Sequence, residues 1–312
     1  MILAYLGHLA ERGTISADSL QPYLSAINTY HADAGLVRPA LGHVVAAARR
    51  GMRRAQAQLT TRDTRTPLPA AVALDILDSA LAELRDGRVR RTPRAQAEWL
   101  RRRYATALAF VFMGRQDSCV HLASADHGID DGFIWLRLTE KMKRGQALRR
   151  VIRLPLTAPP AGGIPSALPR LASLGRAYLE ARKLLGGSPV RLFQLPGEAA
   201  PTTRSMEAWT ATAFAEVGAV APAGFAYLGH SLRSGGSSAA EAILVPRFRG
   251  NWLGGWSQAG RTRELHYLDP SILPTDAAFA LFGWLLGGVY QLEQPVWTAR
   301  RGAAASDDPG EP

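Results

Sequence analysis

Cysteine is almost absent from this chain of 312 residues, which contains only Cys119. A single cysteine excludes an internal disulfide framework and a zinc site built from several cysteines. Long apolar runs are also lacking, because the segment 279–289 is too short to cross a bilayer and carries glycines. The N-terminus does not have the basic and then apolar layout of a secretory signal. We therefore expect an intracellular protein, in the cytoplasm, nucleoid or nucleus, without a membrane span.

Acidic residues are the second shortage, with 26 Asp and Glu against 37 Lys and Arg. The formal net charge is +11 and the pI is about 10.4. This excess of positive charge favours a polyanionic partner, and nucleic acid is a better candidate than a membrane surface. Apolar residues make up 47% of the chain and aromatic residues 8%, which is typical of a globular protein rather than a disordered one.

The N-terminal residues 1–60 predict helices. Apolar residues recur at helical spacing in three consecutive segments, which begin near residues 2, 16 and 40. The third segment ends in a basic stripe made of Arg49, Arg50, Arg53 and Arg54. These arginines are spaced to share one helix face. The stripe is either a solvated helix face or a surface that contacts nucleic-acid phosphates, where each arginine displaces counterions.

The rest of the chain predicts a second, larger domain. Residues 61–69 are polar, contain two prolines and have no periodicity, so we expect a linker there and a domain at 70–300. Two short apolar runs, 133–138 and 151–156, predict a β-hairpin with a basic, glycine-containing tip, and most other segments predict helices. Residues 301–312 are small and acidic, and we expect them to be disordered. The predicted fold class is mainly α with a small antiparallel β-sheet (α+β).

Candidate chemistry is concentrated in residues 230–267. His230 and Arg233 are spaced to lie on one face of a helix, where the two side chains can converge on one target. A guanidinium fork matches a phosphate, and an imidazole accepts or delivers a proton near neutral pH. Trp256 follows within GGWSQ, and Tyr267 closes the stretch.

This stretch resembles the C-terminal signature of the tyrosine recombinase (phage integrase) family. The signature reads His-x-x-Arg, then Gly-His or Gly-Trp, and then a tyrosine after a short spacer. The resemblance implies that Tyr267 attacks a DNA phosphodiester, expels the 5′ hydroxyl and forms a 3′-phosphotyrosyl bond. It also implies that His230 and Arg233 assist the attack and that Trp256 donates a hydrogen bond to the phosphate. Because the covalent bond keeps the energy of the phosphodiester, no ATP is expected. The resemblance also implies that no metal or other cofactor takes part.

The resemblance assigns two further catalytic positions. Arg115 follows an apolar helix, in GRQDS, where the family has the second arginine of the phosphate clamp. Ser118 stands where the family pattern has an acid. Lys141 in the hairpin fits the lysine that protonates the leaving 5′ oxygen, with Lys143 as the alternative. Lys143 and Arg144 are also expected to contact DNA.

Residues 1–60 resemble the helical core-binding domain of the same family, which forms one half of a C-shaped clamp on DNA. The chain begins at the equivalent of the second helix of that domain, so we expect the first helix to be lacking. The resemblance implies that double-stranded DNA is the partner and that the basic stripe contacts its phosphates. It also implies a homotetramer that holds two duplexes in a synaptic complex.

Three functions stay open. The leading hypothesis is a site-specific recombinase or the integrase of a mobile element. A DNA-binding relic of such an element that has lost catalysis is the second, motivated by the shortened N-terminus and the GRQDS context. A type IB topoisomerase-like enzyme is the third, although the separate helical domain and compact size favour a recombinase. Asp126, Asp130 and Asp131 lack the spacing of metal ligands, so they predict turns and no metal site.

Overall fold

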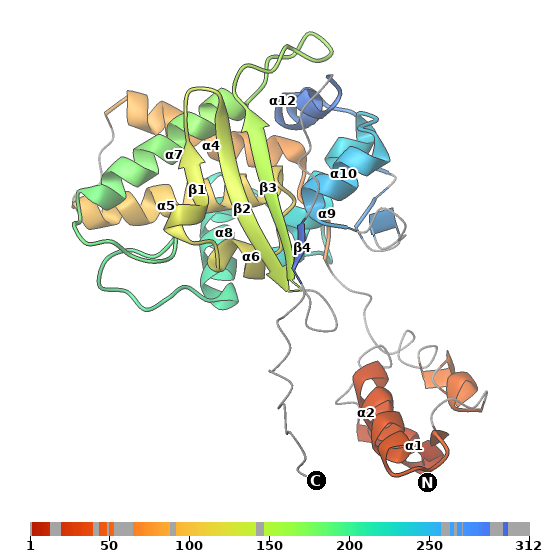
Figure 1. The fold of residues 1–312 in the computed structure, drawn as a ribbon. Helices are drawn as coiled ribbons and strands as arrows, with labels where there is room; N and C mark the ends of the chain where they lie inside the picture. Colours follow the sequence, from red (N-terminus) through yellow and green to blue (C-terminus); the bar gives the residue numbers. More distant parts are fainter. Residues whose placement is uncertain are drawn as a thin grey trace, which may run out of the picture. The chain divides into compact units, whose positions relative to one another are not determined.

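The computed structural model describes eleven stretches of the chain: residues 2–12, 20–39, 44–48, 50–52, 65–87, 92–141, 147–256, 263–264, 267–269, 271–287 and 296–298. At residues 10, 11 and 21 and along 139–141, 147–149 and 296–298 it describes the backbone alone. The chain forms two compact units, Met1–Thr64 and Arg65–Pro312 (Figure 1).

Helices dominate both units, and strands occur in the larger one. The smaller unit has α1 (Ile2–Arg12) and α2 (Leu20–Asp33). The larger unit has α4 (Ala70–Arg85), α5 (Pro93–Val111), α6 (Gln116–Val120), β1 (His127–Ile129), β2 (Phe133–Lys141), β3 (Ala147–Pro155), α7 (Leu168–Lys183), α8 (Thr203–Glu216), α9 (Gly229–Ala242), α10 (Arg247–Gly254), α12 (Asp276–Phe282) and β4 (Val296–Thr298).

The smaller unit has a core of its own. Leu6 and Leu9 of α1 pack with Leu20 and Leu24 of α2, and Val45 joins them. In each helix the two leucines are three or four positions apart, so they lie on one face. This apolar face is what the two helices bury against each other.

Helix α5 is the centre of the larger unit. Thr92 caps its N-terminus, because the Thr92 side chain accepts a hydrogen bond from the Ala95 N–H at 3.1 Å, and Pro93 occupies the first turn. The helix packs against α4, α7, α8 and α9, so most of its surface is buried. Its buried arginines must therefore be paired within the protein. Arg103 donates to Glu216 of α8 at 2.8 Å and contacts Ser79 of α4.

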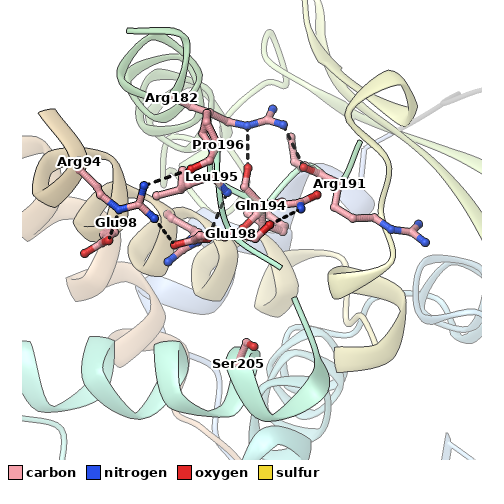
Figure 2. A network of polar contacts seen from close by, with 12 residues as sticks. Arg94, Glu98, Arg182, Arg191, Gln194, Leu195, Pro196, Glu198 and Ser205 are labelled. Atoms are coloured by element: carbon pink, nitrogen blue, oxygen red, sulfur yellow. Dashed lines mark hydrogen bonds and ion pairs between the residues drawn. The ribbon is translucent and has the colours of Figure 1, made fainter. Parts of the chain in front are cut away.

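A second polar network fixes the loop that leads into α8. Glu198 accepts hydrogen bonds from Arg94 and Arg101 of α5, and from the N–H of Leu195 in its own loop. Arg182 of α7 donates to the carbonyl oxygen of Gln194 at 3.0 Å. Figure 2 shows these groups pointing toward one another between the helices. The network holds the loop against both α5 and α7 and so sets where α8 begins.

The strands form one antiparallel sheet in the order β1-β2-β3-β4. Alternate residues of the two long strands are buried: Ile134, Leu136 and Leu138 of β2, and Ile152 and Leu154 of β3. This period of two gives the sheet one apolar face, which packs against the helices. Figure 1 shows α4, α5 and α7 behind the sheet. The mainly α fold with a small antiparallel sheet is confirmed.

Residues 65–69, the second half of the segment predicted to be a linker, lie against α9. The N–H of Leu68 donates to the carbonyl oxygen of Ser231 at 2.9 Å, and the Leu68 side chain is fully buried. A Cβ atom at Gly235 would lie 2.2 Å from the Leu68 carbonyl oxygen, so only glycine allows this approach. The contact anchors the start of the larger unit on the helix that carries His230. None of the helices in the described stretches is both long and apolar enough to cross a membrane.

Candidate active site

Arg233 lies between two aromatic rings. Its side chain extends from α9 and is 1% exposed. The Nη1 atom donates to the carbonyl oxygen of Met113 at 2.5 Å. The guanidinium carbon lies 3.9 Å from the centre of the Trp256 ring and 5.0 Å from that of Tyr267. Both distances are in the range of cation–π contacts. The structure thus brings together three of the predicted site residues from separate segments of the chain.

Tyr267 also contacts His230. The centres of their rings are 6.2 Å apart at an interplanar angle of 61°, and the Tyr267 and Trp256 rings are 5.3 Å apart at 56°. Tyr267 is half-buried and His230 is exposed. The cluster therefore reaches the surface, where a large substrate has access to it.

The glycines of GGW shape the Trp256 position. Helix α10 ends at Gly254, and Gly255 continues in the left-handed region with φ of 70°, which favours glycine. A Cβ atom at Gly254 would lie 1.7 Å from the Trp256 ring. The indole therefore folds back directly over the Gly254 backbone and turns toward α9.

The indole N–H of Trp256 is a buried donor. Trp256 is 7% exposed, and its Nε1 atom has no hydrogen-bond partner among the residues that the structure describes. A buried polar group without a partner costs about 1–3 kcal/mol. A ligand oxygen bound beside Arg233 would remove that cost.

The backbone of Arg115 is held near α9 by the contacts of Met113 and Gln116. The chain leaves α5 through Met113, whose φ of 51° turns the backbone, and Arg115 then caps α6. Met113 accepts the hydrogen bond from Arg233. On the other side, a Cβ atom at Gly229 would lie 2.0 Å from the amide nitrogen of Gln116, so this side chain packs on the first residue of α9. The Arg115 side chain is exposed, and the contacts of Met113 and Gln116 hold its backbone near the helix that carries His230 and Arg233.

The β-hairpin is joined to the same region by Arg150. This buried side chain of β3 donates to the carbonyl oxygens of Trp252 and Leu253, at 2.6 Å each, near the end of α10. Lys141 is the last residue of β2, and its Cα pairs with that of Ala147 in β3. The side chain of Lys141 is not described, so its predicted role stays a prediction.

The predicted DNA contacts fall mostly outside the described residues. This applies to Arg49, Arg53, Arg54, Lys143 and Arg144. Arg50 is described, in a helical segment of the smaller unit, and its side chain is exposed. Residues 301–312, for which disorder was predicted, are also outside.

A pocket of about 490 Å³ opens beside His230. Its lining includes Arg204 and Thr210 of α8 and Gln116 of α6. Neither the Thr210 hydroxyl nor the Gln116 amide nitrogen has a hydrogen-bond partner in the described part of the chain. The pocket beside His230 therefore combines cationic and unsatisfied polar groups with one acidic residue, Glu207.

The acidic segment around residue 130 is structural. Asp130 accepts hydrogen bonds from the N–H groups of Gly132 and Phe133, which closes the turn before β2, and Asp126 pairs with Arg137 at 3.3 Å. Among the described residues, no group of three or more His, Cys, Asp or Glu side chains could hold a metal ion.

Three polar residues beside Tyr267 were not singled out from the sequence. Ser237 and Ser238 lie on α9, and both are buried. Ser237 contacts Arg263, whose side chain is 1% exposed, and Ser238 contacts the backbone of Tyr267 and Asp269. Helical spacing carries a signal for Ser237 alone, because Ser237 is four residues after Arg233 and shares its face.

No family model matches the chain, and no curated protein matches it in sequence. Its structure is similar to the XerH site-specific recombinase bound to palindromic difH substrate in a post-cleavage complex, with a TM-score of 0.53 and 14% identity over 84% of this chain and 67% of that chain. A weaker likeness is to a lambda integrase dimer bound to a COC′ core site, with a TM-score of 0.47 and 20% identity over 85% of this chain and 63% of that chain. Another is to XerA recombinase, with a TM-score of 0.46 and 12% identity over 83% of this chain and 81% of that chain.

Proposed function

Because the chain has the fold of the tyrosine recombinases, we propose that it is a site-specific DNA recombinase or integrase that works through a 3′-phosphotyrosyl intermediate. The observation that carries the proposal is the position of Arg233, whose guanidinium contacts the rings of both Trp256 and Tyr267. A guanidinium matches a phosphate in charge and geometry, and the phenol beside it is a suitable nucleophile.

In the proposed reaction, the Tyr267 oxygen attacks the phosphorus and a P–O bond forms. The bond from phosphorus to the 5′ oxygen breaks, and that oxygen leaves with a proton from Lys141. The 5′ hydroxyl of another strand then attacks the phosphotyrosyl bond and releases the phenol. Each exchange replaces one phosphoester with another, so the sequence of steps needs no ATP.

The two arginines and the indole of Trp256 are proposed to stabilise the transition state electrostatically. Arg115 and Arg233 offset the charge that grows on the pentavalent phosphate, and His230 assists the attack by Tyr267. Removing one such donor typically costs about 3–4 kcal/mol of transition-state stabilisation. The N–H of Trp256, which has no hydrogen-bond partner among the described residues, supports its role as a further donor to the phosphate.

We propose double-stranded DNA as the substrate and a homotetramer on two duplexes as the active assembly. The net charge of +11 and the exposed Arg50 support a polyanionic partner. XerH, with which this chain shares its fold, is a recombinase seen with its palindromic difH substrate. The basic residues outside the described stretches, Lys143 and Arg144 among them, stay proposed DNA contacts.

A second candidate function is a DNA-binding protein that has lost catalysis. One contact favours it: Asp117, two residues after Arg115, pairs with His121, the residue that follows α6, at 3.1 Å. Asp117 is therefore engaged away from Arg115, and Ser118 occupies the position at which the family pattern has an acid. The candidate differs from the first in predicting tight binding without cleavage.

The test is covalent capture. A pool of nicked duplexes with randomised sequence is incubated with the protein, and adducts that resist denaturation are isolated and sequenced. The recombinase predicts adducts at one recovered sequence, none with Tyr267→Phe, and undiminished adducts with Tyr290→Phe as the matched control. Binding of a selected duplex without any adduct would favour the second candidate. Relaxation of supercoiled plasmid without sequence preference would instead indicate a topoisomerase.

A further inference from the structure

We propose that Arg263 and Ser238 are positioning residues that hold Tyr267 on α9 in the geometry for attack. The inference rests on the proposed function of Tyr267 as the nucleophile. It adds two residues that fix the backbone from which the phenol of Tyr267 extends.

Arg263 is a buried cation bound along α9. Its Nε donates to the Ser237 hydroxyl at 2.8 Å and its Nη2 to the Ser237 carbonyl oxygen at 3.2 Å. The same Nη2 pairs with Glu241 of α9 at 3.1 Å. Three contacts from one planar group leave the side chain a single orientation. The chain that leads to Tyr267 is therefore attached to the helix that carries Arg233.

Helix α10 closes the other side of Arg263. A Cβ atom at Gly250 would lie 2.9 Å from the guanidinium carbon, so the α10 backbone packs directly on that group. The same guanidinium lies 5.9 Å from the centre of the Trp256 ring. Arg263 thus fills the space between α9 and α10, beneath the aromatic cluster.

The backbone of Tyr267 is held at both of its polar groups. Its N–H donates to the Arg263 carbonyl oxygen at 2.9 Å. Its carbonyl oxygen accepts from the Ser238 hydroxyl at 3.3 Å, and that hydroxyl in turn accepts from the N–H of Asp269 at 2.8 Å. Since Ser238 is 1% exposed, water does not compete for these bonds. The hydroxyl fixes the chain just after the nucleophile, and Arg263 fixes it just before.

This arrangement attaches the segment that carries the nucleophile to the helix that carries His230 and Arg233. His230 and Arg233 belong to α9, and Ser237 and Ser238 of the same helix hold the Tyr267 segment. Attack requires the reacting oxygen to be aligned with the phosphorus, and a misplacement of about 1 Å can cost roughly a hundredfold in rate. A positioning role therefore predicts slower attack by Tyr267 with no change in how the phosphate is bound or activated.

The primary test compares Ser238→Ala with Ser234→Ala. The Ser234 hydroxyl bonds to the carbonyl oxygen of His230 within α9, so its removal is the matched control. On the captured duplex, we expect Ser238→Ala and Arg263→Lys to slow adduct formation by about ten- to a hundredfold with unchanged duplex affinity. Ser234→Ala should react within about twofold of the wild-type rate.

A second readout separates positioning from folding. In Tyr267→Phe, hydrogen peroxide can serve as the nucleophile: its oxygen bonds to the phosphorus, the bond to the 5′ oxygen breaks, and that oxygen leaves protonated. A diffusible nucleophile does not depend on the Tyr267 backbone. We therefore expect the Ser238→Ala/Tyr267→Phe and Tyr267→Phe proteins to cleave the DNA at equal rates when peroxide is the nucleophile.

Two results would overturn the positioning role alone. One is an unchanged adduct rate in both Ser238→Ala and Arg263→Lys. The other is an equal fold-loss in the peroxide reaction, which would assign these residues to the fold or to phosphate activation. If wild-type protein forms no adduct with any duplex, the proposed function fails and the positioning role fails with it.

Discussion

The guanidinium of Arg233 lies 5.0 Å from the centre of the Tyr267 ring, although 33 residues lie between the two in sequence. The contact is possible because α10 and the GGW turn bring the chain back over α9. The proposed phosphate-binding side chain, which is buried, and the proposed nucleophile, which is half-buried, consequently lie side by side. The contacts of this cluster can be tested one at a time by substitution.

Arg233→Lys should impair cleavage far more than binding. Lysine keeps the positive charge but cannot form the two-pronged contact with a phosphate, and it loses the planar stacking on Trp256. We expect adduct formation to fall about a hundred- to a thousandfold, measured on the captured duplex. Arg176→Lys, an exposed substitution on α7, is the control and should leave the rate unchanged. An equal loss of duplex affinity and adduct rate in Arg233→Lys would contradict the expectation.

Gly254→Ala tests the packing beneath Trp256. The added Cβ would lie 1.7 Å from the indole ring, so the ring must move away from its place beside Arg233. We expect lower adduct formation and a lower melting temperature. The control is Gly132→Ala, where the nearest neighbour, the Asp130 carboxylate, lies 3.7 Å from the added atom. Wild-type activity in Gly254→Ala would mean that the Trp256 position does not matter for the reaction.

Sequence patterns predicted most of the larger unit. Helical periodicity gave α9 and the shared face of His230 and Arg233, and alternation gave the β2–β3 hairpin. Strand β4 was missed because Val296–Thr298 is too short to carry a period of two, and its pairing with β3 is distant in sequence. The anchored segment around Leu68 was missed because two prolines beside a single leucine are typical of a linker.

The polar contacts around Tyr267 could not be predicted for a different reason. Arg263 has the composition of a surface residue, and arginines are rarely buried unless they are paired. Its burial depends on Ser237 and Glu241 of another helix and on the absence of a side chain at Gly250. These contacts join residues that are distant in sequence, so local spacing does not predict them.

His127 should make stability depend on pH. Its ring is buried, bonded to the Tyr104 hydroxyl at 2.6 Å, and burial lowers the pKa of His127 to about 4. The unfolded chain, with a histidine pKa of about 6.5, binds more protons between these values. Its contribution to stability is therefore complete above pH 6.5 and falls as pH drops to 4, by about 3 kcal/mol.

Urea unfolding of wild type and His127→Gln between pH 7 and pH 4 measures this contribution. Carboxylates titrate in both proteins, so the difference between the two curves isolates the histidine. We expect wild type to lose more free energy of unfolding than the variant over this range. Parallel curves would show that His127 protonates equally in the folded and unfolded states.

Glu198→Gln should destabilise the larger unit. The substitution removes the charge that pairs with Arg101, which is 6% exposed, and with Arg94. Breaking a buried pair is costly, and because Glu198 itself is partly exposed we expect about 2 kcal/mol less free energy of unfolding. Glu98→Gln is the control, since its pair with Arg94 is exposed and should contribute about 0.5 kcal/mol or less. Equal losses in the two variants, measured by urea unfolding, would argue against a structural role for this network.

Arg50→Gln tests whether the smaller unit contacts DNA. If the exposed Arg50 neutralises one phosphate, the variant releases one fewer counterion from the DNA when it binds. The slope of log affinity against log salt concentration should then fall in magnitude by about 0.9. The measurement is fluorescence anisotropy with the captured duplex over a series of salt concentrations, with Arg176→Gln on α7 as the control. Affinity should weaken equally for related and unrelated duplexes, because a phosphate contact carries no sequence information. An unchanged slope would assign Arg50 to a solvated helix face, which was the other interpretation of the basic stripe.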